Sequence, residues 1–281
     1  MGVLLAILAA ACYGAGDFSG GLASKRSHST SVTAWSMVIG WIIAVPLAFI
    51  VPSSGFTWNS VTLGVLTGMA GGIGLLSLYR ALAIGTMSIV SPTTAVIAAV
   101  VPLAVGLASG DTLTRWGSIG LIFALVAISL VGLGPTSDGS AKRTGLGLAM
   151  IAGLGFGGVF VFLGRTADNA GLWPLVAARP VGLLMASVMA RSAGVSLVPL
   201  RVDRALASVA GVLDMGANAL YILARTHTSL SIAAVLTSLY PAATVVLARV
   251  VEKERLRRIQ VFGLIAAGVA LMLLAIPPPK T

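Results

Sequence analysis

The sequence predicts an all-α integral membrane protein with ten transmembrane helices arranged as two inverted five-helix repeats. Three observations predict this fold: the composition, ten long apolar runs, and a similarity between the two halves of the chain. Of the 281 residues, 57% are hydrophobic and only 9% are charged, whereas an ordinary soluble domain has about 25% charged residues. So few charges exclude a cytosolic enzyme, a secreted disulfide-bonded domain and a disordered chain.

The remaining composition excludes further classes. The single cysteine, Cys12, permits no internal disulfide and no cysteine cluster. No zinc, nucleotide or serine-triad motif occurs either, so we expect no metal and no cofactor. The formal net charge is +10, but the basic residues lie in short links between apolar runs. This placement indicates contact with a lipid bilayer and membrane orientation, not nucleic-acid binding.

Ten runs are long enough to span the membrane, since a spanning helix needs about 20 mainly apolar residues. The first run has no basic segment before it and leads directly into a second, so we expect a span, not a cleaved signal peptide. Short polar links separate the runs, and helices are favoured over a barrel. The predicted spans are Gly2–Ala23, Ser31–Val51, Ser60–Ile84, Met87–Ala108, Trp116–Gly134, Gly145–Gly164, Trp173–Ala190, Ala205–Ala224, Ser229–Val250 and Ile259–Ile276.

The basic residues predict an orientation in the cell (inner) membrane. Of the 18 Lys and Arg residues, thirteen lie near the ends of odd-numbered spans or in the links after them, and four lie after even-numbered spans or in the tail. The last, Arg179, lies within a span. Because cytoplasmic links carry the excess of Lys and Arg, we expect both termini outside.

The two halves of the chain resemble each other. Leu, Arg, Gly, Leu and Ile recur in register between Thr112–Ile122 and Arg255–Ile265, and Asp111 falls opposite Glu254. Because five spans is an odd number, the second repeat enters the membrane with the opposite polarity, an architecture typical of transporters. The predicted organisation is a first repeat at 1–134, a linker at 135–144, a second repeat at 145–276 and a tail at 277–281.

Two stretches of the second half carry a resemblance to a known family. Ser229–Pro241 and the link Glu252–Leu256, which runs into Gly263 and Gly268, resemble the EamA family of the drug/metabolite transporter superfamily. In the first half, Gly110–Leu113 stands where the family usually has Gly-Glu. The resemblance covers essentially the whole chain. It implies tandem five-helix repeats, a membrane transporter with no enzymatic activity, and a small organic metabolite as substrate.

Three charged residues stand out inside predicted spans, away from the span ends at which Arg80 and Arg249 lie: Asp17, Asp214 and Arg179. A charge at membrane depth costs about 2.5–3.5 kcal/mol or more, so each requires a reason. One aspartate can serve as a proton or cation site, because a desolvated carboxylate holds a proton more readily. Arg179 can hold a substrate carboxylate, and the opposite charges together favour a zwitterion such as an amino acid. The structural alternative is an internal ion pair, or for Asp17 an approach to Lys25 and Arg26 at the interface.

Several polar and aromatic side chains are candidates for completing a cavity around these charges, although tyrosine and tryptophan also serve as interface anchors. They are Asn218 and Tyr221 on the helix face of Asp214, Tyr13 on the face of Asp17, Tyr79 at the end of the third span, and Trp35 in the second.

Glycines and prolines predict packing and hinges. Gly64, Gly68 and Gly72 form overlapping GxxxG steps, which are typical of close helix contact. Pro102 and Pro241 each lie late in the fourth span of their half, and we expect both to act as hinges or kinks.

A secondary transporter explains the spans, the repeats and the sparse buried charges together. We expect alternating access by a monomer, with or without proton coupling. Two alternatives stay open. One is a membrane scaffold or accessory subunit, which a solid, dry core would favour. The other is an intramembrane aspartyl protease, because Gly14-Ala15-Gly16-Asp17 spells the GxGD pattern and Asp214 offers a second carboxylate.

Overall fold

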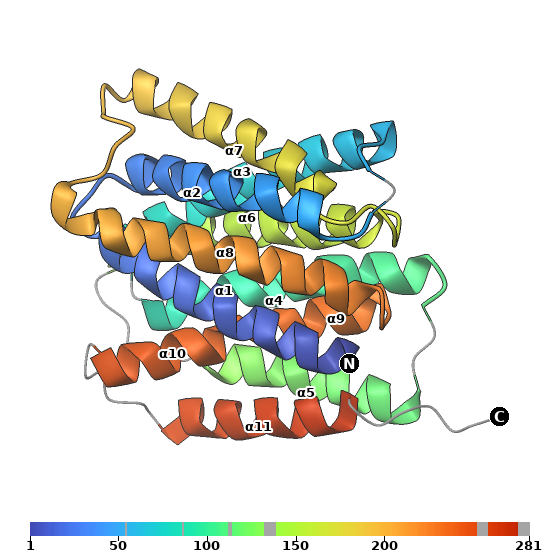
Figure 1. The fold of residues 1–281 in the computed structure, drawn as a ribbon. Coiled ribbons are helices and arrows are strands. Elements are labelled where there is room, and N and C mark those ends of the chain that lie inside the picture. Colours follow the sequence, from blue (N-terminus) through green and yellow to red (C-terminus); the bar gives the residue numbers. More distant parts are fainter. Residues whose placement is uncertain (54, 86, 112–113, 132–138, 252–257, 275–281) are drawn as a thin grey trace.

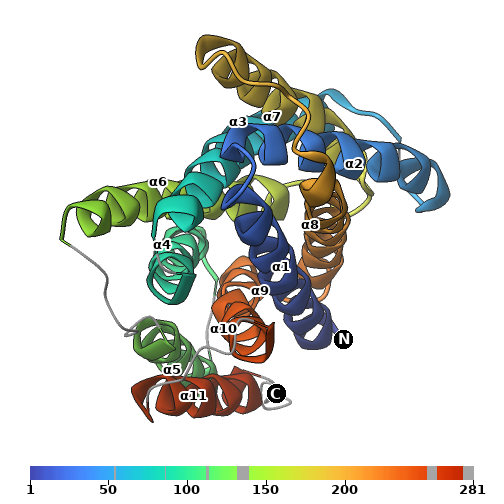
Figure 2. The same cartoon turned by 90° about the vertical axis from the view of Figure 1, so that its left-hand side faces the viewer.

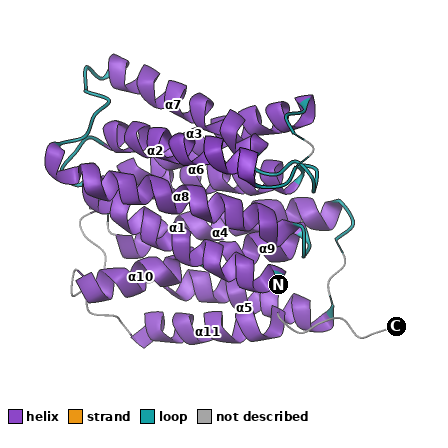
Figure 3. Ribbon diagram, in the orientation of Figure 1, coloured by secondary structure: helices purple, strands orange, loops and turns teal. Residues whose placement is uncertain are grey.

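A computed structural model of the chain describes residues 1–53, 55–85, 87–111, 114–131, 139–251 and 258–274, and the regular elements within these ranges are all helices (Figure 3). Successive long helices cross the molecule in alternating directions, so α1 begins and α11 ends at the same end of the bundle (Figure 1). The elements are α1 (Gly2–Ser24), α2 (Ser29–Ile50), α3 (Trp58–Ile84), α4 (Met87–Ala108), α5 (Arg115–Val131), α6 (Gly139–Gly164), α7 (Trp173–Ser192), the 3₁₀ turn η1 (Arg201–Asp203), α8 (Arg204–Arg225), α9 (Leu230–Thr237), α10 (Tyr240–Val251) and α11 (Arg258–Leu274).

Eight helical segments among the described residues are long and apolar enough to cross a membrane. One of them consists of α9 and α10 together, and two further apolar helices, within α5 and α11, are shorter. These segments occur in the same order as the ten predicted runs. Parts of the predictions lie outside the described residues, namely the ends of the fifth and tenth spans at Gly134 and Ile276, residues 135–138 of the linker, Thr112, Leu113, the link Glu252–Leu256 with Glu254, and the tail at 277–281.

The apolar span in the sixth helix is Gly145–Gly164, as predicted, but the helix itself is longer than this span. Helix α6 begins at Gly139, so the second part of the predicted 135–144 linker is helical. No proline or further glycine interrupts the chain between Gly139 and Gly145, and a helix continues through residues that neither remove a backbone donor nor favour left-handed conformations.

The predicted ninth span, Ser229–Val250, is two helices instead of one. Helix α9 ends at Thr237 and α10 begins at Tyr240, immediately before Pro241. Proline lacks the backbone N–H that a continuous helix requires, but it is tolerated in the first turn, where that N–H has no helical partner. Pro102, by contrast, lies inside the uninterrupted helix α4.

Helix packing joins the two halves of the chain. Helix α1 packs against α8 and α3 against α6, while α2 and α3 both contact α7 and α5 pairs with α11 at one edge (Figure 2). The α3–α7 contact follows the predicted GxxxG stripe. A Cβ atom added at Gly64 would lie 2.5 Å from the carbonyl oxygen of Pro174, so only glycine permits this approach.

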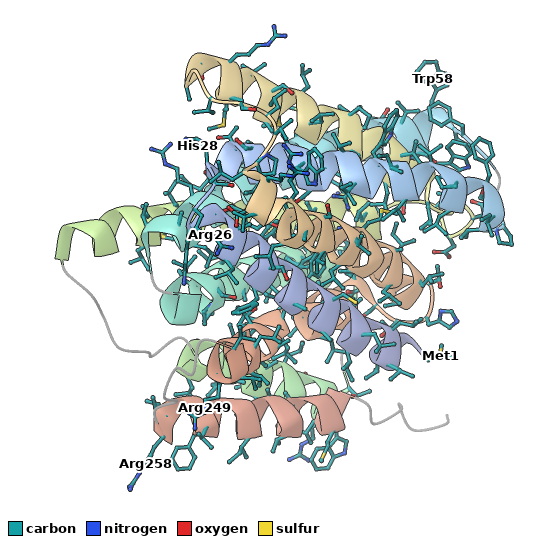
Figure 4. All side chains as sticks on the ribbon, turned by 60° about the vertical axis from the view of Figure 1, so that its left-hand side comes forward. Met1, Arg26, His28, Trp58, Arg249 and Arg258 are labelled. Atoms are coloured by element: carbon teal, nitrogen blue, oxygen red, sulfur yellow. The ribbon has the colours of Figure 1, made fainter. Side chains whose placement is uncertain are left out.

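The two ends of the bundle differ in charge and in their link contacts. Arg26, Arg249 and Arg258 lie at one end, here called the basic end, and Met1 and Trp58 lie at the other (Figure 4). At the basic end, the fully buried Asp203 accepts a hydrogen bond of 2.8 Å from Nε of Arg26 and also pairs with its Nη2 at 2.6 Å. This ion pair ties the α1–α2 link to the α7–α8 link.

Link residues also close the opposite end, where α4 ends (Figure 1). Asp111 accepts hydrogen bonds from the backbone N–H of Ser231 at 3.0 Å and from its hydroxyl at 2.8 Å. Ser231 lies in the first turn of α9, whose backbone N–H groups have no helical acceptor. The Asp111 carboxylate therefore caps α9 from the other half of the chain.

Candidate binding cavity

A cavity lies between six helices, three from each half of the chain. Helices α1, α2 and α3 form one side of the cavity, and α6, α7 and α8 form the other. Small-molecule sites have mostly apolar walls and a few placed polar groups. The polar residues here are Tyr13, Thr67, Arg179, Asp214 and Asn218.

Arg179 and Asp214 form the charged part of the wall. Nη1 of Arg179 donates to Oδ2 of Asp214 in an ion pair between α7 and α8, and Arg179 is only 5% exposed. The same guanidinium lies 3.6 Å from Sδ of Met37 and 3.8 Å from Sδ of Met215. A Cβ atom at Gly40 would lie 3.3 Å from Cζ of Arg179, so this glycine leaves space for the guanidinium. The ion pair predicted as a structural alternative therefore lines the cavity.

Asn218 lies beside this pair, as its spacing on α8 predicted. Its Nδ2 donates a hydrogen bond of 2.7 Å to the backbone oxygen of Asp214, one turn earlier, and the residue lines the cavity. Tyr13 also lines it, from α1. Of the predicted companions, these two are brought to the cavity.

Asp17 lies in a smaller compartment next to the cavity. This compartment has room for about one water-sized group and shares three wall residues with the larger one. Its lining consists of Tyr13, Asp17, Phe156, Val159, Phe160 and Tyr240. Asp17 is 5% exposed, and Arg26 pairs with Asp203 instead. Of the two basic residues that the sequence-based alternative placed near Asp17, Lys25 and Arg26, the second is therefore bound to another carboxylate.

The structure pairs Asp214 with an arginine. A protease dyad needs two carboxylates within hydrogen-bonding distance of each other. Asp214 is hydrogen-bonded to Arg179, and none of the hydrogen bonds found among the described residues joins it to Asp17. The geometry therefore gives no support to the GxGD interpretation.

Three other predicted companions are absent from the lining of both compartments. The fully buried Tyr221 donates its hydroxyl at 2.8 Å to the backbone oxygen of Phe160. Trp35 donates from Nε1 at 2.9 Å to Oγ of Ser208. Tyr79 is buried where the last turns of α3 pack against Gly20 of α1. These side chains satisfy polar groups or fill contacts between helices.

Other wall residues carry no charge and were not identified from the sequence. Met37 on α2, Thr67 on α3 and Phe156 on α6 line the cavity. Each lines it because its helix is rotated so that this side turns inwards. The one available signal was the GxxxG stripe, since Gly68 and Gly72 lie in the α3 wall as well as in a helix contact. That stripe indicates close packing and does not by itself indicate a cavity.

The fold and the cavity define a multi-pass helical membrane protein with a charged pocket between its halves. The EamA-like transporter family matches residues 1–133 and 143–276. The chain therefore belongs to the EamA-like transporter family, which confirms the resemblance seen in the sequence. The fold also matches 27 chains of solved structures. One of them, titled "Crystal structure of protein", is 14% identical in sequence to this chain. It superimposes with a TM-score of 0.71 over 98% of this chain and 96% of its own, so the two share a fold. No curated protein matches the sequence.

Proposed function

We propose that this protein is a secondary transporter that moves a small organic metabolite, such as an amino acid, across the cell membrane by alternating access. The observation that carries the proposal is a cavity between the two halves with the Arg179–Asp214 ion pair in its wall. The cavity favours transport over the scaffold alternative, for which a solid core is expected. Membership of a transporter family supports the same conclusion.

Alternating access is supported by reciprocal contacts between the halves. Helix α1, the first of its half, packs against α8, the third of the other, and α6 packs against α3 in the same way. The second helices, α2 and α7, contact each other, as do the fifth helices, α5 and α11. Such matching contacts between corresponding helices are expected for inverted repeats related by a pseudo-twofold axis in the membrane plane. In this architecture the substrate site lies at the interface of the repeats.

The ion pair suggests how the substrate is held. A guanidinium offers two parallel N–H donors to a carboxylate, and a carboxylate accepts from an ammonium group. A zwitterion can therefore replace each partner of the Arg179–Asp214 pair with one of its own charges. The pair stabilises the empty cavity, and the substrate takes over its interactions when it binds.

Uptake into vesicles tests this proposal. The purified full chain is reconstituted and assayed with a panel of amino acids and other small metabolites, and at least one is expected to accumulate. We expect Arg179→Gln to lower that uptake at least tenfold, because a hydrogen bond between charged groups contributes about 1.5–3 kcal/mol. Trp35→Phe, outside the cavity, serves as the control. Absence of uptake for the whole panel would favour an accessory subunit.

The same vesicles test proton coupling. If the Asp214 carboxylate exchanges a proton for substrate, Asp214→Asn abolishes substrate-driven proton movement, because an amide cannot release a proton. An internal pH indicator measures that movement. Unchanged coupling and uptake in the variant would remove Asp214 from the mechanism.

A further inference from the structure

Helix α7 has a gap in its hydrogen-bond ladder next to the arginine of the cavity. Pro180 lies inside α7 and has no backbone N–H, so it cannot donate to the backbone oxygen of Val176, four residues earlier. In membrane helices, neighbouring groups re-satisfy a backbone oxygen that a proline leaves free. Arg179 directly precedes this proline. The backbone that carries Arg179 therefore lacks one of its helical restraints.

The missing donor comes from the other half of the chain. Nε1 of Trp41, on α2, donates a hydrogen bond of 3.2 Å to the backbone oxygen of Val176. The indole N–H is the only donor that a tryptophan side chain has, and here it reaches the oxygen that Pro180 leaves free. Trp41 therefore replaces, from α2, the helical bond that is missing in α7.

The same part of α2 also contacts the guanidinium of Arg179. Sδ of Met37, one turn before Trp41, lies 3.6 Å from Nη1 of Arg179. A Cβ atom at Gly40 would lie 3.3 Å from Cζ of Arg179. Positions 37, 40 and 41 share one face of a helix, so this face of α2 contacts both the backbone and the charged group of α7. A shift of α7 along this face would move Arg179 away from Asp214 on α8.

Space beside the break leaves α7 without packing on one side. A groove is lined by Trp41, Arg179, Pro180, Leu183, Leu184 and Ser187. Leu184 is 64% exposed, so the groove opens at the surface of the bundle. Side chains therefore do not fill the space between α2 and the turns of α7 that follow Pro180. The hydrogen bond from Trp41 is a restraint that packing does not replace there.

We propose that Trp41 is a positioning residue, which fixes α7 at Pro180 and thereby holds the guanidinium of Arg179 in the cavity wall. Trp41 does not line the cavity itself, so it acts through the backbone oxygen of Val176. The effect of Trp41 on uptake rests on the proposed function, but the restraint on α7 does not.

A double-mutant cycle on the purified full chain in detergent tests the restraint. Trp41→Phe keeps an aromatic ring and removes the donor, while Pro180→Ala returns a backbone N–H to the oxygen of Val176. We expect Trp41→Phe to accelerate hydrogen–deuterium exchange in α7 about fivefold, the factor that corresponds to one net hydrogen bond. In the Pro180→Ala background, the same substitution should change exchange by less than about twofold, since independent changes add within that factor.

Trp173→Phe is the matched control. Trp173, the first residue of α7, also donates from Nε1 at 3.2 Å, but its acceptor is Oγ of Ser53 and not an oxygen freed by a proline. Its effect should therefore be the same with and without Pro180→Ala. No acceleration by Trp41→Phe, or equal acceleration in both backgrounds, would overturn the proposal.

The location of the effect decides if Pro180→Ala does not fold, as judged by gel filtration. Trp41→Phe should then accelerate exchange in α7 and leave α5, at the far edge of the bundle (Figure 2), unchanged. An equal acceleration in the two helices would overturn the proposal, because it would show a global loss of stability.

Uptake separates a positioning role from a structural one. When Arg179 is displaced, substrate binding weakens, so we expect Trp41→Phe to raise the KM for uptake severalfold at unchanged kcat, and Trp173→Phe to leave KM unchanged. A normal KM in a Trp41→Phe variant whose α7 exchanges faster would overturn the positioning role. A parent protein that takes up no metabolite loses the proposed function, and the exchange cycle alone then decides whether Trp41 fixes α7.

Discussion

At the scale of single residues, the Arg179–Asp214 pair has two separable roles. Asp214→Asn leaves a guanidinium buried without a counter-ion, which costs about 3–5 kcal/mol in comparable sites. We expect this variant to unfold at a clearly lower temperature in detergent. Replacing both partners, as in Arg179→Met with Asp214→Leu, removes the unpaired charge, so thermal stability returns close to that of the parent while uptake stays absent. A double variant that still transports would show the pair to be architectural.

Tyr221 illustrates a polar residue whose role is packing. Its hydroxyl is hydrogen-bonded to the backbone of Phe160, so Tyr221→Phe leaves a buried carbonyl oxygen without that donor. We expect a loss of about 1–3 kcal/mol in the free energy of unfolding, with the KM for uptake unchanged. Thermal unfolding and uptake kinetics measure the two quantities. A large rise in KM at unchanged stability would return Tyr221 to the substrate site.

At the scale of elements, glycine controls how closely α3 approaches α7. A Cβ atom at Gly64 would lie 2.5 Å from Pro174 O and 2.7 Å from Cβ of Ala177. We therefore expect Gly64→Ala to destabilise the protein by about 1–3 kcal/mol through overpacking. Gly147, in α6, has open space around it, and Gly147→Ala should be neutral or stabilising by up to about 1 kcal/mol. Thermal unfolding of the two variants compares them directly, and equal effects would contradict a tight α3–α7 contact.

The break between α9 and α10 shows an element whose form depends on a distant link. Asp111, near the end of the first half, supplies acceptors to the first turn of α9. An eight-residue helix is too short to be stable alone. Helix α9 is therefore held in place by its cap and by packing, since most of its residues are buried.

At the scale of the whole molecule, Asp203 holds the basic end closed. It is fully buried, whereas its partner Arg26 is half exposed, so Asp203→Asn leaves Arg26 free to reach water. The cost is the charged hydrogen bonds to Arg26, about 1–3 kcal/mol. We expect a lower unfolding temperature for this variant and no change for Asp168→Asn at the surface. A stability equal to that of the parent would show that the two links are held by other contacts.

The position of the termini is also a property of the whole molecule. Helix α1 begins and α11 ends at the end opposite Arg26, Arg249 and Arg258 (Figures 1 and 4). Because basic residues remain on the cytoplasmic side, reporters fused before Met1 and after Thr281 should both register the outer side. A topology reporter active only in the periplasm or only in the cytoplasm measures this. Cytoplasmic signals from both fusions would reverse the orientation.

The sequence by itself determined the class of protein, the order of the apolar segments and the family. Long apolar runs predict helices because the hydrocarbon core of a bilayer offers no hydrogen-bond partners, so the backbone N–H and C=O groups must pair within the segment. The sequence also identified Arg179, Asp214 and Asp17, since any charge in a span is costly enough to be noticed. Only the tertiary structure decided that Arg179 pairs with Asp214, that Asp17 lies apart among aromatic rings, and that Tyr221 is a packing residue. Spacing along one helix shows which residues share a face, but the partner of that face depends on how each helix is rotated and tilted against its neighbours. That rotation is set by side-chain packing over the whole bundle.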